Sequence, residues 1–116
     1  MISLPWPARE LHPNSRSHWA VKSRATKAAR TQAYWLAHMG MTELPDGPIA
    51  VRIVFHPPDN RRRDVDGMLS ACKAYLDGCA DAYGVDDNRF RLTIERGESV
   101  KGGCVLAAQA GSPATT

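Results

Sequence analysis

Two aspartates separated by one residue follow directly after three consecutive arginines, and this block offers the clearest chemistry in the chain. Arg61, Arg62 and Arg63 precede Asp64 and Asp66. Side chains alternate in direction along an extended segment, so the two aspartates project to the same side. Paired carboxylates repel each other unless a cation lies between them, and oxygen ligands favour a hard ion such as Mg²⁺. Because arginines suit phosphate, the block indicates metal-assisted phosphodiester hydrolysis.

A third carboxylate would complete such a metal site, and the Asp86–Asp87 pair is the source that the sequence offers. The pair precedes an alternating strand expected over residues 90–95, which can lie beside another strand expected over residues 49–55. Asp87 is the preferred ligand and Asp86 the second choice. Taken by themselves, these acidic motifs also fit plain helix capping, a sugar-nucleotide site or surface turns.

Lys73 is the candidate for charge stabilisation during catalysis. It lies on the same stripe of an expected helix as Asp66, and a long helical side chain leans back toward the helix N-terminus. From there its ammonium group could stabilise a phosphorane-like transition state. The alternative is an i,i+4 surface ion pair with Asp77, which would contribute about 0.5 kcal/mol at best.

Positive charge is concentrated in the first half of the chain, which favours a polyanionic partner. Residues 1–63 carry ten Lys or Arg and four Asp or Glu, whereas residues 64–116 carry five and eight. This asymmetry suits a protein that holds nucleic acid with one part and metal with another. The expected DNA contacts are Arg61, Arg62, Arg63, Asn14, Arg16, Lys22, Arg24 and Lys27. For the helical residues among them, the alternative is a solvated helix face with Trp19 in the core.

The elements that must position these residues predict an α+β fold, because period-2 and helical patterns both occur. The expected elements are strands over 1–6, 49–55, 90–95 and 104–108, helices over 17–39 and 68–83, and a hairpin turn over 97–103. They should form a small mixed or antiparallel sheet of about four strands with two helices packed on it. One nuclease domain is expected over residues 1–110, followed by a flexible tail over 111–116. Trp19, Trp35 and Met39 are expected on the apolar stripe of the first helix.

Composition excludes several classes of protein. At 116 residues with 43% apolar content, the chain suits one globular domain. It has no apolar run as long as a membrane span and no signal-peptide pattern, so a cytoplasmic protein without membrane association is expected. Its three cysteines lack paired metal spacing and are expected to be reduced core thiols. It has no Gly-rich phosphate loop, and no organic cofactor is expected.

Three stretches of the chain resemble the RusA family of Holliday-junction resolvases, which come from phages and prophages. The stretches are Leu4-Pro5-Trp6-Pro7, the run from Pro58 to Asp66, and Leu76-Asp77-Gly78 together with Val85-Asp86-Asp87. The resemblance extends from Ile2 to Ala108. It is specific because the arginine run, the D-x-D and the later D-D occur in the same order as in the family.

This resemblance implies a homodimeric, Mg²⁺-dependent endonuclease that nicks four-way DNA junctions symmetrically, with Mn²⁺ as a substitute ion. Such an enzyme would act in DNA recombination and repair. Its metal ligands would fall on Asp64, Asp66 and Asp87. Arginines 61–63 and the basic N-terminal segment would face the DNA backbone.

The chain departs from the family pattern at two positions. Gly67 stands where the family usually has an asparagine, and Ser70 stands where it usually has a lysine. Lys73 follows one turn later on nearly the same helical face. Either Lys73 substitutes for the family lysine or that role is empty in this chain.

Two other functions are compatible with the same residues. A non-catalytic module would bind branched or duplex DNA and use its acids only for capping and charge balance. It would keep its DNA affinity but show no cleavage with Mg²⁺. A metal nuclease acting on other branched or single-stranded DNA would differ in its substrate alone.

Overall fold

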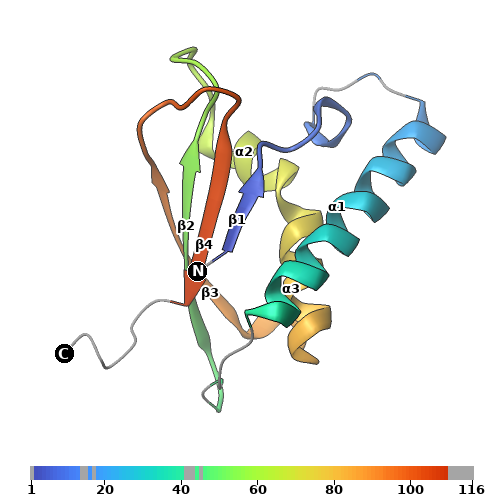
Figure 1. Ribbon diagram of the computed structural model, residues 1–116, viewed down its shortest axis with the longest axis vertical. Coiled ribbons are helices and arrows are strands. Elements are labelled where there is room, and N and C mark those ends of the chain that lie inside the picture. The colour runs from blue at the N-terminus through green and yellow to red at the C-terminus, as the bar shows by residue number, and fades with distance from the viewer. Residues whose placement is uncertain (1, 14–15, 17, 41–43, 45, 110–116) are drawn as a thin grey trace.

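The computed structural model describes residues 2–13, 16, 18–40, 44 and 46–109, which form a sheet with helices on one face (Figure 1). Its elements are β1 (Ile2–Pro5), η1 (Arg9–Leu11), α1 (Trp19–Met39), β2 (Ile49–His56), α2 (Val65–Ala71), α3 (Lys73–Tyr83), η2 (Asp87–Arg89), β3 (Phe90–Arg96) and β4 (Cys104–Gln109). The expected α+β class with four strands is confirmed. Among the described helices, none combines the length and apolarity needed to cross a membrane. The tail expected over 111–116 lies outside the described residues.

The sheet is mixed because one of its connections is a helical crossover. Its strand order is β1-β4-β2-β3. β2 pairs with β3 in parallel, whereas β4 is antiparallel to both β2 and β1. A parallel pair needs a crossover connection, which α2 and α3 provide. The hairpin expected over 97–103 is wrong, because β2 lies between β3 and β4. The connection crosses the end of β2, where the Val100 amide donates to the Pro57 carbonyl at 2.9 Å.

The helix expected over 68–83 is two helices that meet at Cys72. α2 begins after Asp64, earlier than expected, and α3 ends at Gly84, whose φ of 68° is left-handed. Cys72 has φ −95° and ψ 3°, and its amide donates to the Leu69 carbonyl at 3.0 Å. A bond across three residues tightens the last turn of α2 and ends it. The described part of the chain therefore contains three α-helices where two were expected.

α1 packs on α3 through small residues instead of aromatic ones. Its buried positions are three alanines spaced by four residues, Ala29, Ala33 and Ala37. A Cβ on Gly78 of α3 would collide with the Arg30 carbonyl of α1, so the two backbones approach closely. Large side chains do not fit such a contact. The stripe expected for Trp19, Trp35 and Met39 is therefore wrong, and Trp19 and Met39 are 74% and 80% exposed.

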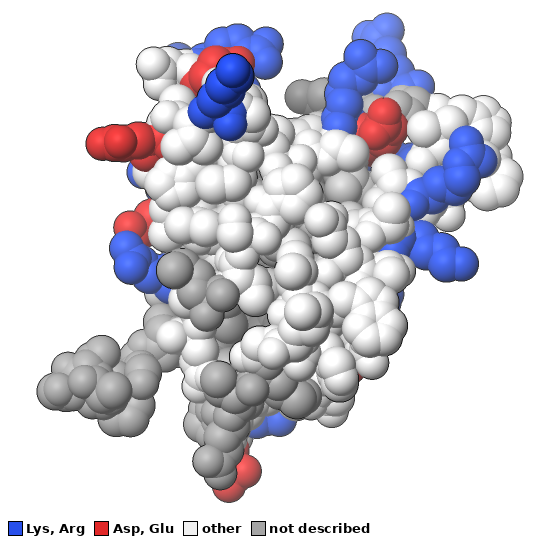
Figure 2. Space-filling model, in the orientation of Figure 1, with Lys and Arg blue, Asp and Glu red and all other residues white. Residues whose placement is uncertain are grey.

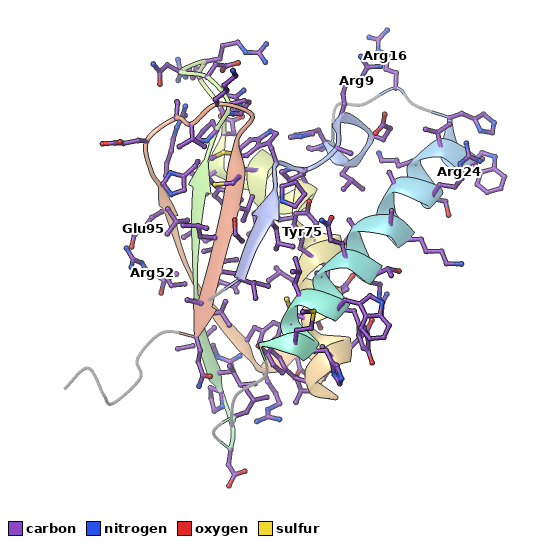
Figure 3. All side chains as sticks on the ribbon, viewed as in Figure 1. Arg9, Arg16, Arg24, Arg52, Tyr75 and Glu95 are labelled. Carbon is purple, nitrogen blue, oxygen red and sulfur yellow. The ribbon has the colours of Figure 1, made fainter. Side chains whose placement is uncertain are left out.

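The hydrophobic core lies between the sheet and the helices. The elements that carry the candidate site all pack around it. Phe55 of β2 is fully buried. The Tyr75 hydroxyl of α3 donates to the Pro5 carbonyl of β1 at 2.9 Å, which ties the helix layer to the far strand (Figure 3). The three cysteines are free thiols, but only Cys72 is buried, whereas Cys79 and Cys104 are half-buried, so the expectation of core thiols is met by Cys72. Burial raises the pKa of Cys72 to about 12, so this thiol stays protonated at neutral pH.

Candidate functional site

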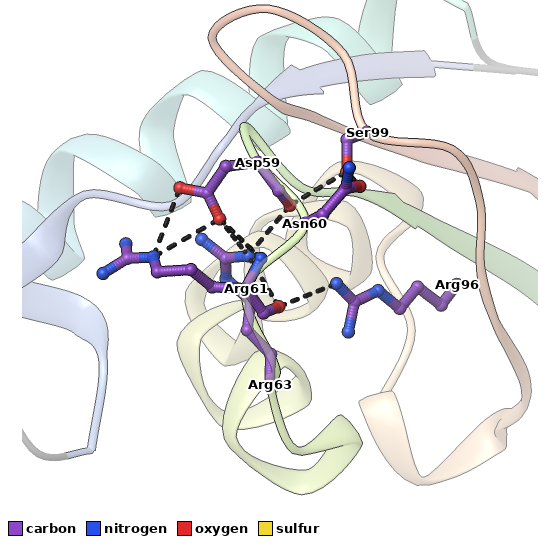
Figure 4. Close-up of polar contacts among 6 residues, drawn as sticks. All are labelled: Asp59, Asn60, Arg61, Arg63, Arg96 and Ser99. Atoms are coloured by element: carbon purple, nitrogen blue, oxygen red, sulfur yellow. Dashed lines mark hydrogen bonds and ion pairs between the residues drawn. The ribbon is translucent and has the colours of Figure 1, made fainter.

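The loop from Pro57 to Asp64 joins β2 to α2 and carries the three arginines, and we call it the arginine loop. Its organising group is the Asp59 carboxylate (Figure 4). This carboxylate accepts hydrogen bonds from the Arg61 amide at 3.0 Å and from Arg63 Nη1 at 2.9 Å. The guanidinium of Arg63 and the amide of Arg61 lower the pKa of Asp59 to about 2. At neutral pH the loop is therefore built around a fixed negative charge.

The arginines of this loop divide into one that is enclosed and two that face solvent. The Arg63 side chain is only 14% exposed and lies over the Trp6 ring, with 5.5 Å from its guanidinium carbon to the ring centroid. A guanidinium above an aromatic face is held there by the ring quadrupole. The Arg61 side chain is 77% exposed, and Arg62 is also exposed. The Arg61 and Arg62 side chains are thus exposed to solvent, although Arg61 Nε also lies 3.3 Å from the Asp59 carboxylate, while Arg63 shapes the loop.

Two residues near the β3–β4 connection hold the arginine loop from the other side. The Ser99 hydroxyl donates to the Asp59 carbonyl at 2.8 Å and lies 2.5 Å from the Asn60 side-chain oxygen. Arg96, at the end of β3, donates to the Arg61 carbonyl at 2.9 Å. These bonds fix the backbone of the loop as well as its side chains (Figure 4).

A second polar cluster lies where α3 meets the start of β3. The Lys73 ammonium donates to Asp77 at 2.7 Å and to Asp87 at 2.6 Å. Its neighbours form a cleft with apolar walls, which is lined by Leu69, Ser70, Lys73, Leu76, Asp87, Phe90 and Leu92. The ammonium lowers the pKa of Asp87, and hydrogen bonds from Lys73 to Asp77 and Asp87 raise the pKa of Lys73. The ion pair with Asp77 that the sequence offers as the alternative is present, and Lys73 also contacts Asp87. Asp66 and Lys73 stand on different helices, so they do not share one helical stripe, and the catalytic role of Lys73 stays a prediction.

The remaining acidic candidates lie at helix N-termini. Asp64 is the N-cap residue of α2, although its side chain makes no capping hydrogen bond, and Asp66 lies in the first turn of that helix. Both are exposed. Asp86 is the N-cap residue of η2 and accepts a hydrogen bond from the Asn88 amide at 3.0 Å. A helix N-terminus favours negative charge, which suits Asp64 and Asp66 at the start of α2, whereas Asp86 is held by its bond to the Asn88 amide.

The donor set fits a hard divalent cation in its chemistry, because every candidate ligand is a carboxylate. In the described conformation, however, no three Asp, Glu, His or Cys side chains among residues 2–13, 16, 18–40, 44 and 46–109 form a group that could hold a metal ion. The structure brings Lys73 to Asp87, and it does not gather Asp64, Asp66 and Asp87 into one such group.

The other expected DNA contacts lie toward the N-terminal end of α1. Arg16, Arg24 and Lys27 are exposed and Lys22 is half-buried, whereas Asn14 lies outside the described residues. Lys and Arg side chains gather at the end of the molecule that carries the arginine loop and the start of α1 (Figure 2). Figure 3 shows Arg9, Arg16 and Arg24 together on this side. The alternative that placed Trp19 in the core is wrong, since most of its surface is exposed.

Sequence reasoning missed the residues that organise the site. Asp59, Ser99 and Arg96 act only through contacts with the arginine loop. For Asp59 a local signal existed, because Asp after Pro-Pro commonly accepts a hydrogen bond from the amide two residues later. For Ser99 and Arg96 none existed, because their partners lie more than thirty residues away.

Comparison with known proteins adds a distant similarity to junction endonucleases. No protein-family model matches the chain. The chain is 42% identical over 93 residues to an uncharacterized protein of Xylella fastidiosa, and the match covers 77% of this chain and 61% of that protein's length. It is 28% identical over 106 residues to the crossover junction endodeoxyribonuclease RusA of Escherichia coli K12, with 83% of this chain and 85% of the relative covered. The RusA protein of Enterobacteria phage 82 shows the same identity over 109 residues.

Replacing Asp59 with Asn should loosen the arginine loop, because a neutral amide oxygen accepts weaker hydrogen bonds from guanidinium than a carboxylate does. In the wild type the carboxylate contributes fully above its ordinary pKa of about 4, and its contribution is lost as the pH falls toward about 2. The Arg61 amide resonance, followed by NMR during acid titration, should therefore show a transition near pH 2. That transition should vanish in Asp59→Asn and persist in the control Asp46→Asn.

Proposed function

We propose that this chain is a metal-dependent endonuclease that cleaves phosphodiester bonds in four-way DNA junctions. The observation that carries the proposal is the ordered arginine loop, which runs directly into the exposed Asp64 and Asp66 carboxylates at the start of α2. A phosphate clamp beside acidic groups is the arrangement that phosphodiester hydrolysis needs. The similarity to RusA endonucleases over 83% of the chain supports the junction as substrate.

Asp64, Asp66 and Asp87 are the proposed ligands of the divalent cation, with Asp86 as a further ligand or as a hydrogen-bonded support. Mg²⁺ suits an all-carboxylate set, and Mn²⁺ accepts the same ligands. When bound, such an ion polarises a phosphate oxygen and lowers the pKa of a bound water. No organic cofactor is part of the proposal.

The side chains of the arginine loop bind and orient the DNA in this proposal. Arg61 and Arg62 are exposed and would contact phosphate oxygens directly, because a guanidinium matches them with paired donors. Arg63 acts through position, since its contacts with Asp59 and Trp6 hold the loop in shape. The basic residues near the start of α1 would extend the contact along the DNA backbone.

Lys73 has two proposed effects, one before DNA binds and one after. Its ammonium group lies 2.6 Å from an Asp87 oxygen, so it competes with a divalent cation for that carboxylate. Once phosphate is present, the same charge is placed to stabilise negative charge that develops during cleavage. This second effect makes Lys73 the stand-in for the lysine that the family pattern places at the position of Ser70.

A homodimer would match the symmetry of the substrate. A four-way junction offers two opposed strands, and a two-fold assembly presents two equivalent sites to them. Paired cuts of this kind resolve a junction in DNA recombination and repair. The RusA relatives are named for crossover-junction cleavage, which supports a junction as the substrate of the present chain.

Replacing Asp66 with Asn should lower the rate of nicking of a labelled synthetic four-way junction in Mg²⁺ by about 100-fold or more. The substitution removes a ligand charge at nearly constant shape, while binding to the junction should persist or tighten because repulsion of phosphate falls. Cleavage is measured by gel analysis and binding by fluorescence anisotropy. Asp46→Asn, the same change on an exposed turn, should cleave normally.

Several outcomes would contradict the nuclease. A wild-type protein that binds the junction but never nicks it would support the non-catalytic module. Equal cleavage by wild type and Asp66→Asn would remove Asp66 from the site. Faster cleavage of other branched or single-stranded DNA than of the four-way junction would reassign the substrate.

Replacing Lys73 with Gln should tighten Mn²⁺ binding and at the same time slow junction cleavage. The Lys73 side chain is 60% exposed, and an exposed ion pair contributes about 1 kcal/mol or less, so the gain in Mn²⁺ affinity should be about fivefold at most. Mn²⁺ binding is measured by electron paramagnetic resonance without DNA, which separates it from activity. The control is Lys101→Gln, on an exposed turn. Unchanged Mn²⁺ affinity in Lys73→Gln would show that the ammonium does not compete for Asp87.

A further inference from the structure

β3 is an edge strand with an open side, and its length sets it apart from the opposite edge. In the strand order β1-β4-β2-β3, β3 pairs only with β2 among the described strands. It spans seven residues without proline, whereas β1 at the other edge spans four and ends at Pro5. An exposed strand edge of this length is a template for pairing with another strand.

The backbone of β3 offers regular donors and acceptors on that open side. The Gly97 amide donates to the Phe55 carbonyl at 2.8 Å, which shows that position 97 turns its backbone groups toward β2. Backbone direction alternates along a strand, so positions 91, 93 and 95 also face β2. The amide and carbonyl groups of Leu92 and Ile94 therefore point to the open edge.

The side chains of β3 carry opposite charges placed symmetrically about its centre. Arg91 and Glu95 flank Thr93, and all three are exposed. They lie on the solvent face of the sheet, whereas Ile94 and its neighbour, the buried Ile53, lie on the helix face. The Arg91 guanidinium donates to the backbone carbonyls of Asn88 and Phe90. The Glu95 carboxylate accepts two hydrogen bonds from Arg52 (Figure 3). A carboxylate has about four acceptor sites, so Glu95 can take a second guanidinium.

We propose that two copies of this chain pair antiparallel along β3, with Thr93 opposite Thr93 of the partner subunit. This register pairs all seven residues of the strand. It sets Arg91 opposite the partner's Glu95, and opposite charges across neighbouring strands are stabilising. Centring the pair on Arg91 or on Glu95 would set like charges opposite each other. A shift of the centre by one residue would leave two residues of each strand unpaired.

The same register also covers apolar surface on the helix side of the sheet. Leu92 is 36% exposed and lines the cleft beside Lys73 and Asp87. In the paired strands it would lie opposite the partner's Ile94, so that each Leu92 is covered by the other copy. Hydrogen bonds, opposite charges and apolar contact thus select the same arrangement.

The pairing also joins the two clusters of the candidate site across the two-fold axis, and this step rests on the proposed function. Phe90, which lines the Lys73–Asp87 cleft, would lie opposite the partner's Arg96. Within one chain Arg96 is bonded to the Arg61 carbonyl at 2.9 Å, so the arginine loop lies beside it. The arginine loop of each copy would then lie beside the Asp87 cleft of the other, and each site would need both chains.

The first experiment introduces one cysteine at the centre of β3. Thr93→Cys should form a covalent dimer under mild oxidation. In the proposed register the two copies of residue 93 are a directly opposed pair that exchanges no hydrogen bonds, and the Cα atoms of such a pair lie about 4.5 Å apart. A disulfide spans Cα distances of about 4.4–6.8 Å. Arg91→Cys is the matched control. Residue 91 lies two residues from the centre, opposite the partner's Glu95, so the two introduced cysteines would be far from each other. The wild type controls for the native thiols. Selective cross-linking of Thr93→Cys supports the interface, whereas absent or equal cross-linking of the two variants overturns it.

The second experiment mixes two inactive chains. Asp87→Asn and the double variant Arg61→Ala/Arg62→Ala should each lose junction cleavage, and a heterodimer isolated with two different tags should regain a nick in one strand. In that heterodimer one cleft has the intact Asp87 of one chain and the intact arginine loop of the other. No regain of nicking overturns the shared site. A wild type that does not cleave overturns the proposed function instead, while the disulfide result still decides the interface.

Discussion

The parallel pairing of β2 with β3 is the constraint on which the arrangement of this molecule depends. Parallel neighbours cannot be joined by a tight turn, so the chain must leave one end of the sheet and return to the other. α2 and α3 form this crossover connection. The arginine loop and Asp64 lie at its beginning, and Asp87 lies at its end. The crossover thereby spreads the acidic residues along the helix layer. Lys73, near its middle, is the residue that reaches Asp87.

A negatively charged side chain, Asp59, holds the positively charged arginine loop in shape. Three adjacent arginines would repel one another, and an unpaired loop of this kind would be poorly ordered. Asp59 offsets the repulsion by accepting hydrogen bonds from Arg63 and from the Arg61 backbone, and it leaves the Arg61 and Arg62 side chains exposed. Preorganisation of this sort reduces the entropy that must be lost when a phosphate binds.

Local pattern was enough to predict part of this structure. The strand over 49–55, the strand after Asp87, the end of α1 at Gly40 and the end of α3 at Gly84 all follow from periodicity and glycine caps. Features that depend on distant contacts could not be read in this way. The sheet order, the burial of alanines in place of tryptophans on α1, and the enclosure of Arg63 over Trp6 are set by packing partners far along the chain. The metal ligands Asp64, Asp66 and Asp87 remain a prediction of chemistry and resemblance.

The short first strand has a consequence for assembly size. Once two copies have joined along β3, the continuous sheet would end in a β1 strand on each side. That strand has four residues, and Pro5 at its end has no amide hydrogen to offer a newcomer. Further copies would then find little to add to, so growth would stop at a closed pair and would not proceed to an open fibre.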